Sequence, residues 1–371
     1  MVKQLSSVDM HFLVKELKEL EGSRVDKIYN KGKEEVYIQV HKSGAGKKII
    51  RIIVGKDIFL SSSKDTDESP SGFCMMLRKH LENMFIDSIS QIEPERILRF
   101  VFKTKADEKS LYLEFFGKGN FILCSREDII IDALIRQKFR DRSVMAKEKY
   151  INPEMKYNLF KLDKDKLSVL LKNSAKDKLI ISLAVELGLG GVYSEEVFLL
   201  CKIDKDKEPN KIDEKEISKI LASIKKIISG KKNVQIVYDT KGAVDIIPID
   251  MEFYKENEKK KFPSFNEALD HYFTHEVKLI KKETAVEMKI NELNRIIKEQ
   301  KAKIKSMESK EDENKKKAEL IYTNYNLIKE ILTEINKATT KYPWEEIKKK
   351  LKGHKVVKEV DVKEKMVVVE V

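Results

Sequence analysis

The stretch SGFCMMLRKHLENMFIDSISQIEPERILRFVF, residues 71–102, begins with the apolar spacing of a helix and ends as a strand. Phe73, Leu77 and Leu81 recur every four residues, which predicts an amphipathic helix with its charged side chains on the other face. Phe100 and Phe102 alternate within an aromatic-rich run, which predicts a strand. A helix that passes into a strand in this way favours an α+β fold.

Between the two elements lies Glu93-Pro94-Glu95-Arg96. Proline disfavours the helical conformation for the residue before it, so we expect Glu95 and Arg96 at the start of the strand. An acid beside a base at such an edge has two interpretations. It is either an exposed surface pair, which contributes little stability, or a pair kept for binding.

Composition restricts the class of protein. The chain has 371 residues, enough for two or three domains. Charged residues make up 37% and the net charge is +12. So high a charged fraction with a positive balance favours long solvated helices and a polyanionic partner.

The three cysteines, Cys74, Cys124 and Cys201, are far apart and form no CxxC pair, so no zinc finger is expected. The first residues contain no apolar signal segment, and no apolar run approaches the ~18 residues that cross a bilayer. These features favour a cytoplasmic protein without a membrane partner. His271 and His275 share helical metal-ligand spacing, but no third ligand accompanies them, so no metal or other cofactor is expected.

The first 165 residues predict a strand-rich lobe. Ser6 or Ser7 is a candidate N-cap, with Asp9 in the first helical turn, where the helix dipole favours a carboxylate. Capping alone would explain Asp9. The glycine- and lysine-rich residues 43–48 lie between two predicted strands and favour a hairpin turn over a phosphate loop. Residues 117–120 predict a second hairpin turn.

Residues 166–275 predict a helical domain. Within it, residues 183–197 read LAVELGLGGVYSEEV, with a helix ending at Gly188, a turn at Gly190 and Gly191, and a second helix capped by Ser194. This pattern is typical of a helix-hairpin-helix. It would expose backbone N–H groups to a nucleic-acid phosphate, although any tight helical hairpin needs glycine.

Residues 276–340 predict an antiparallel coiled-coil hairpin. Apolar residues recur at near-heptad spacing up to Ile304, a polar break covers residues 305–317, and the stripe resumes at Leu320. Residues 341–371 are expected to begin a middle domain that continues beyond this sequence.

Several motifs occur together in one order: LSSVDMHFLVKEL, FCMMLRKHLENMFI, PERIL, LEFFGKGNFIL, LGLGG and FPSFNEALDHYF. With the predicted coiled coil, they make the chain similar to the NFACT family, whose members include bacterial RqcH and eukaryotic NEMF. The resemblance covers essentially the whole chain.

The resemblance implies ribosome-associated quality control without catalysis. The expected partners are the large ribosomal subunit, the stalled nascent chain and a recruited tRNA, typically tRNA-Ala, which extends the nascent chain without a template. The family's functional aspartate and Asp-Arg pair fall on Asp9, Glu95 and Arg96. Glu95 stands where the family has aspartate, so the charge is kept and the reach is longer.

The family's first lobe also resembles that of formamidopyrimidine-type DNA glycosylases, which leaves a second interpretation, a protein that binds DNA or another RNA without a tailing role. Those glycosylases use an N-terminal proline and a zinc finger, whereas here Val2 and Lys3 follow Met1. A third class, a surface adhesin, is suggested by an older name of the family, and the absence of a signal segment argues against it.

Overall fold

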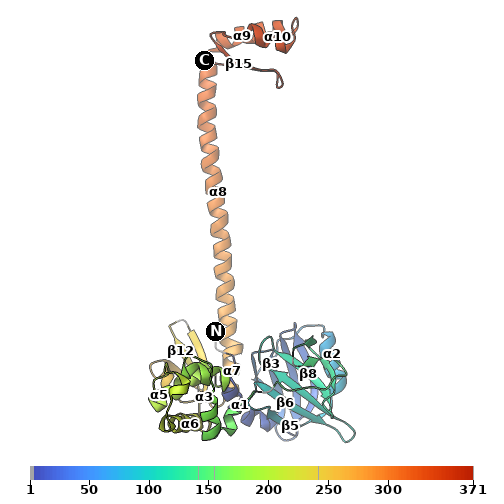
Figure 1. Cartoon of the computed structure of the whole chain (residues 1–371). Helices are drawn as coiled ribbons and strands as arrows, with labels where there is room; N and C mark the ends of the chain where they lie inside the picture. Colours follow the sequence, from blue (N-terminus) through green and yellow to red (C-terminus); the bar gives the residue numbers. More distant parts are fainter. Residues whose placement is uncertain (1–3, 141, 154, 241, 371) are drawn as a thin grey trace. The chain divides into compact units, whose positions relative to one another are not determined.

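A computed structural model describes residues 4–140, 142–153, 155–240 and 242–370, without the side chains of residues 278–288. Val2 and Lys3, which bear on the glycosylase interpretation, lie outside these residues. The chain forms two compact units, Met1–Ile280 and Lys281–Val371 (Figure 1). The boundary expected at residue 165 falls inside the first unit.

A large antiparallel sheet dominates the first unit and confirms the α+β prediction. Its strands follow the order β4-β3-β2-β1-β5-β6-β7-β8-β9. Their bounds are β1 Arg24–Lys31, β2 Glu35–Lys42, β3 Gly46–Ile53, β4 Asp57–Ser61, β5 Phe85–Gln91, β6 Ile97–Lys103, β7 Glu108–Glu114, β8 Asn120–Ser125 and β9 Ile130–Ala133. The predicted turns at residues 43–48 and 117–120 connect β2 to β3 and β7 to β8, as expected.

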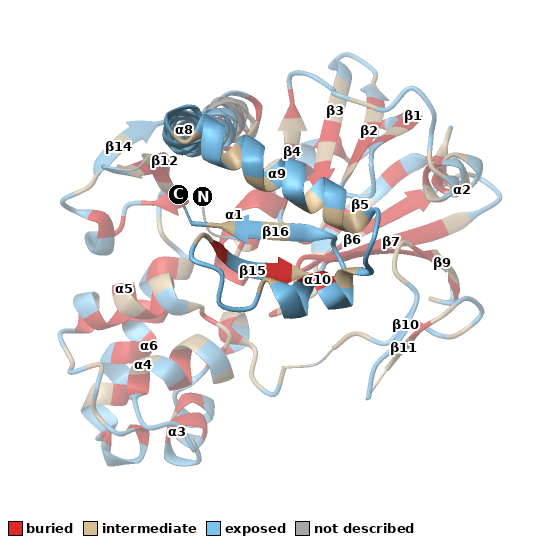
Figure 2. Ribbon diagram, turned by 90° about the horizontal axis from the view of Figure 1, so that it is seen from above, coloured by how far each residue is buried: buried red, intermediate tan, exposed pale blue. Residues whose placement is uncertain are grey.

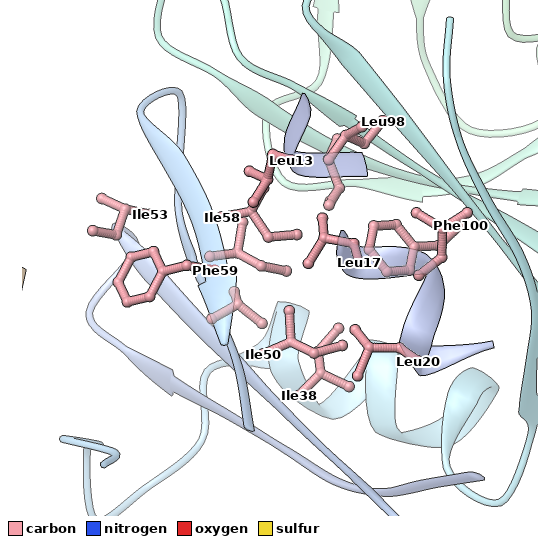
Figure 3. Packing of buried hydrophobic residues seen from close by; sticks show 14 of the residues in the cluster. Leu13, Leu17, Leu20, Ile38, Ile50, Ile53, Ile58, Phe59, Leu98 and Phe100 are labelled. Atoms are coloured by element: carbon pink, nitrogen blue, oxygen red, sulfur yellow. The ribbon is translucent and has the colours of Figure 1, made fainter. Parts of the chain in front are cut away.

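The sheet divides into two halves between β1 and β5, because the only register pair that joins these strands is Arg24↔Phe85. Helix α1 (Ser7–Leu17) fills the space between the halves. Figure 3 shows Leu13 and Leu17 packed between Ile50 and Ile58 of one half and Phe100 of the other. Burying a leucine in such a core stabilises the fold by roughly 1.5–3 kcal/mol.

Helix α1 also contacts a second core on its other face. Val8 and Phe12 pack there with Tyr193 and Leu189. The helix therefore has almost no solvent-facing side, which explains why its middle, Val8 to Val14, is apolar except at Asp9 and His11.

The second core belongs to a helical region that follows the sheet (Figure 2). Its helices are α3 Lys164–Lys172, α4 Leu179–Ile181, α5 Gly191–Cys201 and α6 Glu214–Ile228. A three-stranded sheet of order β13-β12-β14 accompanies them. Its strands are β12 Lys232–Asp239, β13 Gly242–Ile249 and β14 Glu258–Lys261.

This small sheet joins the two cores, because successive side chains of a strand point to opposite faces. Ile236 and Ile246 belong to the first core, and their neighbours Val237 and Ile247 belong to the second. Together with α1, the sheet packs the strand-rich and helical regions into one unit.

The remaining elements of the first unit are short. They are α2 Gly72–Leu81 and α7 Phe265–His271, the two-stranded β10 Gln137–Lys138 and β11 Ser143–Val144, the 3-10 turns η1 Lys18–Leu20, η2 Leu159–Lys161, η4 Pro209–Lys211 and η5 Glu252–Tyr254, and the π-helical turns η3 Ser182–Glu186 and η6 Tyr272–Glu276. Helix α2 is the helix predicted at the start of residues 71–102.

The second unit corrects the coiled-coil prediction. Helix α8 runs from Val277 to Thr323 without a break, and α9 follows as Tyr325–Thr339. The polar residues 305–317 contain neither glycine nor proline, and pairs such as Lys315–Glu311 (2.8 Å) support helix at this spacing. The polar segment was therefore wrongly interpreted as a turn. The rest is α10 Trp344–Lys350, β15 Val357–Asp361 and β16 Met366–Val369.

Candidate nucleic-acid interface

Five of the six predicted site residues line one cleft in the first unit. The cleft has a volume of about 510 Å³, and Glu95, Arg96, Gly188, Gly190 and Gly191 all contribute to its wall. Residues almost a hundred positions apart in sequence therefore meet in space. The sixth residue, Asp9, is not among those that line the cleft.

The turn that carries Glu95 and Arg96 is held by the start of α1. Ser7 Oγ donates a hydrogen bond of 2.5 Å to the carbonyl oxygen of Pro94. Gln91 Nε2 donates to the carbonyls of Ser7 and Glu95, both at 3.1 Å. The prediction that Glu95 and Arg96 begin the strand was wrong, since β6 starts at Ile97. The turn frees both side chains from strand alternation, so both can line one cleft.

Arg96 is half-buried, and its Nη1 lies 3.5 Å from Gln4 Oε1. No carboxylate in the described part of the chain forms an ion pair with it. Burial lowers the pKa of Arg96 from its ordinary value, and the charge of Glu95 opposes that shift. Burial likewise raises the pKa of Glu95, and Arg96 opposes it. The guanidinium therefore retains hydrogen-bonding capacity toward the cleft.

The opposite wall is the glycine turn between η3 and α5. Gly188 and Gly190 have φ values of 74° and 81°, a left-handed conformation that favours glycine, and Leu189 between them is fully buried. Helix α5 begins at Gly191 with Gly190 as N-cap, so the predicted cap at Ser194 was wrong. Ser194 Oγ instead donates to the carbonyl of Gly190 at 2.8 Å.

This helix start leaves backbone donors available. Among the described residues no acceptor takes the N–H of Gly191 or of Val192, and Gly190 supplies no side-chain cap. The space above Gly190 and Gly191 is open, since a Cβ added at either would meet no atom within 4 Å. Unpaired N–H groups at a helix N-terminus favour an anion.

Asp9 lies beneath the cleft and is 1% exposed. It forms a capping box with Ser6, whose hydroxyl donates to Asp9 Oδ2 at 2.6 Å. Tyr193 of α5 donates a hydrogen bond of 2.5 Å to Asp9 Oδ1. Asp9 thus connects the start of α1 to the helix that forms the glycine wall, and it positions the cleft from below.

Two further buried carboxylates, Asp57 and Asp245, were not anticipated from the sequence. Tyr254 donates to Asp245 Oδ2 at 2.6 Å. Burial raises the pKa of Asp57 well above its usual range, and the charges of Asp9 and Asp245 raise it further. Asp57 is the first residue of β4. Its burial could have been inferred from the sequence only by assigning an acidic residue to the inward face of that strand.

A sequence profile described as "NFACT N-terminal and middle domains" matches residues 6–367. The chain belongs to the NFACT family. Similar NFACT proteins include the archaeal Rqc2 homolog aRqcH of Methanocaldococcus jannaschii, which is 31% identical over 96% of this chain and 55% of its own length. The NEMF homolog of Drosophila melanogaster, a ribosome quality control complex subunit, is 24% identical over 97% of this chain and 42% of its own. The chain spans about half the length of these relatives.

Two solved structures share the fold of this NFACT chain. The fibrinogen binding protein of Staphylococcus aureus gives a TM-score of 0.61 at 17% identity, over 72% of this chain and 98% of its own. The N-terminal part of the fibronectin/fibrinogen-binding protein of Streptococcus suis gives 0.58 at 22% identity, over 73% and 99%. At these identities the likeness supports the fold alone.

No helix of the described residues is long and apolar enough to cross a membrane. The same residues contain no group of three or more His, Cys, Asp or Glu side chains arranged to hold a metal ion. His271 and His275 lie with their rings 5.4 Å apart, and the Nδ1 of His271 is 3.3 Å from Glu276.

Substitution of Asp9 is expected to reduce the free energy of unfolding much more than substitution of Arg96. Asp9→Ala removes a helix cap and leaves the buried Tyr193 hydroxyl without that acceptor, which should cost about 2–4 kcal/mol. Arg96→Ala removes one long contact and should change the free energy of unfolding by less than about 0.5 kcal/mol. Urea denaturation of both variants measures this, and equal losses would contradict the different roles assigned to the two residues.

Asp57→Asn is expected to stabilise the protein increasingly as pH rises. A carboxyl whose pKa is raised in the folded state contributes fully below its unfolded pKa, about 3.9, and loses that contribution as pH rises through the folded value. Asparagine does not ionise. The gain should therefore be small near pH 4 and grow by at most about 1.4 kcal/mol per pH unit. Urea denaturation at several pH values tests it, with exposed Asp87→Asn as the control, and a gain independent of pH would contradict it.

Proposed function

We propose that this protein is a ribosome-associated quality control factor that has no catalytic activity of its own. It binds RNA through the cleft lined by Glu95, Arg96, Gly188, Gly190 and Gly191, here called the Arg96 cleft. The cleft pairs a guanidinium with open backbone N–H groups, and both are donors that suit phosphate. The net charge of +12 adds a long-range attraction for a polyanion. This convergence of Arg96 with the start of α5 is the observation that carries the proposal.

The family supplies the biological setting. Relatives along nearly the whole chain are named as subunits of the ribosome quality control complex. By that relation, we propose that the protein binds the large ribosomal subunit with its stalled nascent chain and recruits a tRNA, with tRNA-Ala as the first candidate, for template-free tailing. Glu95, with one more methylene than aspartate, would orient Arg96 or accept from a ribose hydroxyl, because a carboxylate repels phosphate.

The hydroxyls of the cleft support a binding role. Ser6 Oγ is engaged by Asp9 and Ser7 Oγ by Pro94, and no histidine lines the cleft. Both hydroxyls thus serve hydrogen bonds that hold the helix start and the Pro94 turn, and these structural roles are what support a binding site over a catalytic one. Competition between tRNA and duplex DNA of equal charge distinguishes this proposal from a DNA-binding role.

Gly191→Pro is expected to weaken tRNA binding several-fold without unfolding the protein. Gly191 is the first residue of α5, where proline is well tolerated and removes only an N–H that the helix does not use. Gly191→Ala keeps that N–H and is the matched control. Fluorescence anisotropy with purified tRNA measures both, and Arg96→Ala should weaken binding in the same assay. Equal affinity of the proline and alanine variants would contradict a role for the helix start.

Helix α8 is expected to serve ribosome binding rather than tRNA binding. Removing Lys298–Lys315 deletes 18 residues, or five helical turns, so the helix keeps its phase and loses about 27 Å of length. This segment has six lysines against five acids, so the net charge hardly changes. Co-sedimentation with large subunits should be lost, whereas binding to free tRNA should be kept.

The control for this deletion replaces the same residues with an 18-residue helical Glu/Ala/Lys sequence of equal net charge. It shows whether subunit binding requires the length of α8 or the particular side chains of the deleted segment. Loss of both activities on deletion would argue against separate roles for α8 and the cleft.

A further inference from the structure

A second cleft, of about 630 Å³, opens on the strand-rich side of the first unit, and Gln4 lines both it and the Arg96 cleft. Its walls are the β1–β2, β3–β4 and β7–β8 turns and the segment after β9. The charged side chains that line it are four cations and one carboxylate: Lys33, Lys56, Lys118, Arg136 and Glu34.

A backbone contact between Gly55, which lines this second cleft, and the buried Gly119 joins two of its walls. Gly55 and Gly119 have φ values of 68° and 74°. A Cβ added at Gly119 would lie 2.1 Å from the nitrogen of Gly55, so no other residue fits without displacing the backbone. The contact holds the β3–β4 and β7–β8 turns together and thereby brings Lys56 and Lys118, each adjacent to one of these glycines, to the same wall.

Hydrogen bonds hold the other walls. Asn120, which is buried, donates to the carbonyl of Ile135 and accepts from the N–H of Ile135, both at 2.9 Å. The N–H of Val54 donates to the carbonyl of Glu34 at 2.8 Å. The segments that carry Lys33 and Arg136 are thus tied to the same strands as the glycine contact, and the cleft is preformed.

The positive charge in this cleft is largely uncompensated. Lys33, Lys56 and Lys118 are exposed and form no ion pair with any described residue, whereas Arg136 pairs with Asp132 at 2.9 Å. Asp57 follows Lys56 directly but points into the core and is 4% exposed. Like charges held together by a rigid backbone repel one another, and an anion between them removes that cost.

We propose that the second cleft binds the phosphodiester backbone of the RNA held in the Arg96 cleft, with Lys56 and Lys118 as its principal phosphate contacts. The inference rests on the proposed function and extends it to a neighbouring surface. Gln4, shared by both clefts, gives a continuous path between them. The lysines provide point charges for phosphate without base readout.

The test is the salt dependence of tRNA affinity for the full chain carrying Lys56→Ala and Lys118→Ala. Each lost phosphate contact lowers the slope of log K against log[salt] by about 0.7–0.9, so the double variant should lose about 1.5 in slope and bind several-fold more weakly. Lys105→Ala with Lys219→Ala removes the same charge from exposed lysines that line neither cleft. This control should keep the wild-type slope, and thermal denaturation checks that both double variants are folded.

The outcomes separate the two proposals. If the Lys56/Lys118 double variant has the same slope of log K against log[salt] as the control, the proposed role of the second cleft is overturned. Weaker tRNA binding by Gly191→Pro in the same assay would then still support the proposed function. Wild-type protein that binds no tRNA overturns both. Binding of an acidic peptide that requires these lysines, with an unchanged tRNA slope, would assign the cleft to a protein partner and also overturn the inference.

Discussion

The burial of helix α1 on both faces is the constraint on which the first unit depends. A helix at the edge of a domain needs one apolar stripe, but α1 packs Leu13 and Leu17 against the strands and Val8 and Phe12 against the helical region. The two sheet halves share one register pair at β1–β5 and a few flanking backbone hydrogen bonds, such as Val25 N–H to the Met84 carbonyl at 2.8 Å, and the helix adds the side-chain packing between them. Interiors are close-packed, so a change in α1 is transmitted to both regions.

The polar groups of α1 determine how the surrounding segments are oriented. At its start, Ser7 holds the Pro94 turn and Asp9 accepts from Tyr193. Near its end, Glu16 accepts from the N–H groups of Phe265 and Asn266, at 2.9 and 3.0 Å, and so caps α7. Buried carboxylates are costly unless they are hydrogen-bonded. The polar groups of α1 thus determine which segments lie against it, and two of these, the Pro94 turn and α5, form the cleft.

The sequence predicted those features that depend on local pattern. Residues 71–102 predicted α2 and the strand β6. Strand β5 was missed, since its polar residues Asp87, Ser88 and Ser90 obscure the two inward positions Ile86 and Ile89. The glycine turn at Gly188 and Gly190 followed from composition. The break at residues 305–317 was wrong because charge was taken for a helix stop, although lysine and glutamate are good helix formers.

Long-range pairings could not be predicted, because no local pattern records which distant residue completes a buried group. Asp9 and Tyr193 are 184 positions apart. Arg142 is one of the cations counted in the net charge, yet it forms a bidentate pair with buried Glu114, at 2.5 and 3.0 Å. Arg142 is therefore not available at the surface. The net charge alone overstates how much positive charge the surface presents.

Both clefts depend on glycines at positions where a Cβ would be strained or excluded. Glycine loses more conformational entropy on folding than other residues, so such positions reduce stability unless something offsets them. In the first cleft the buried Leu189 anchors the glycine turn, and in the second the strands β3 and β8 anchor Gly55 and Gly119. Because the turns that carry the N–H donors and the lysines are already held in place, the phosphate chain proposed as ligand would bind with little further ordering of the backbone.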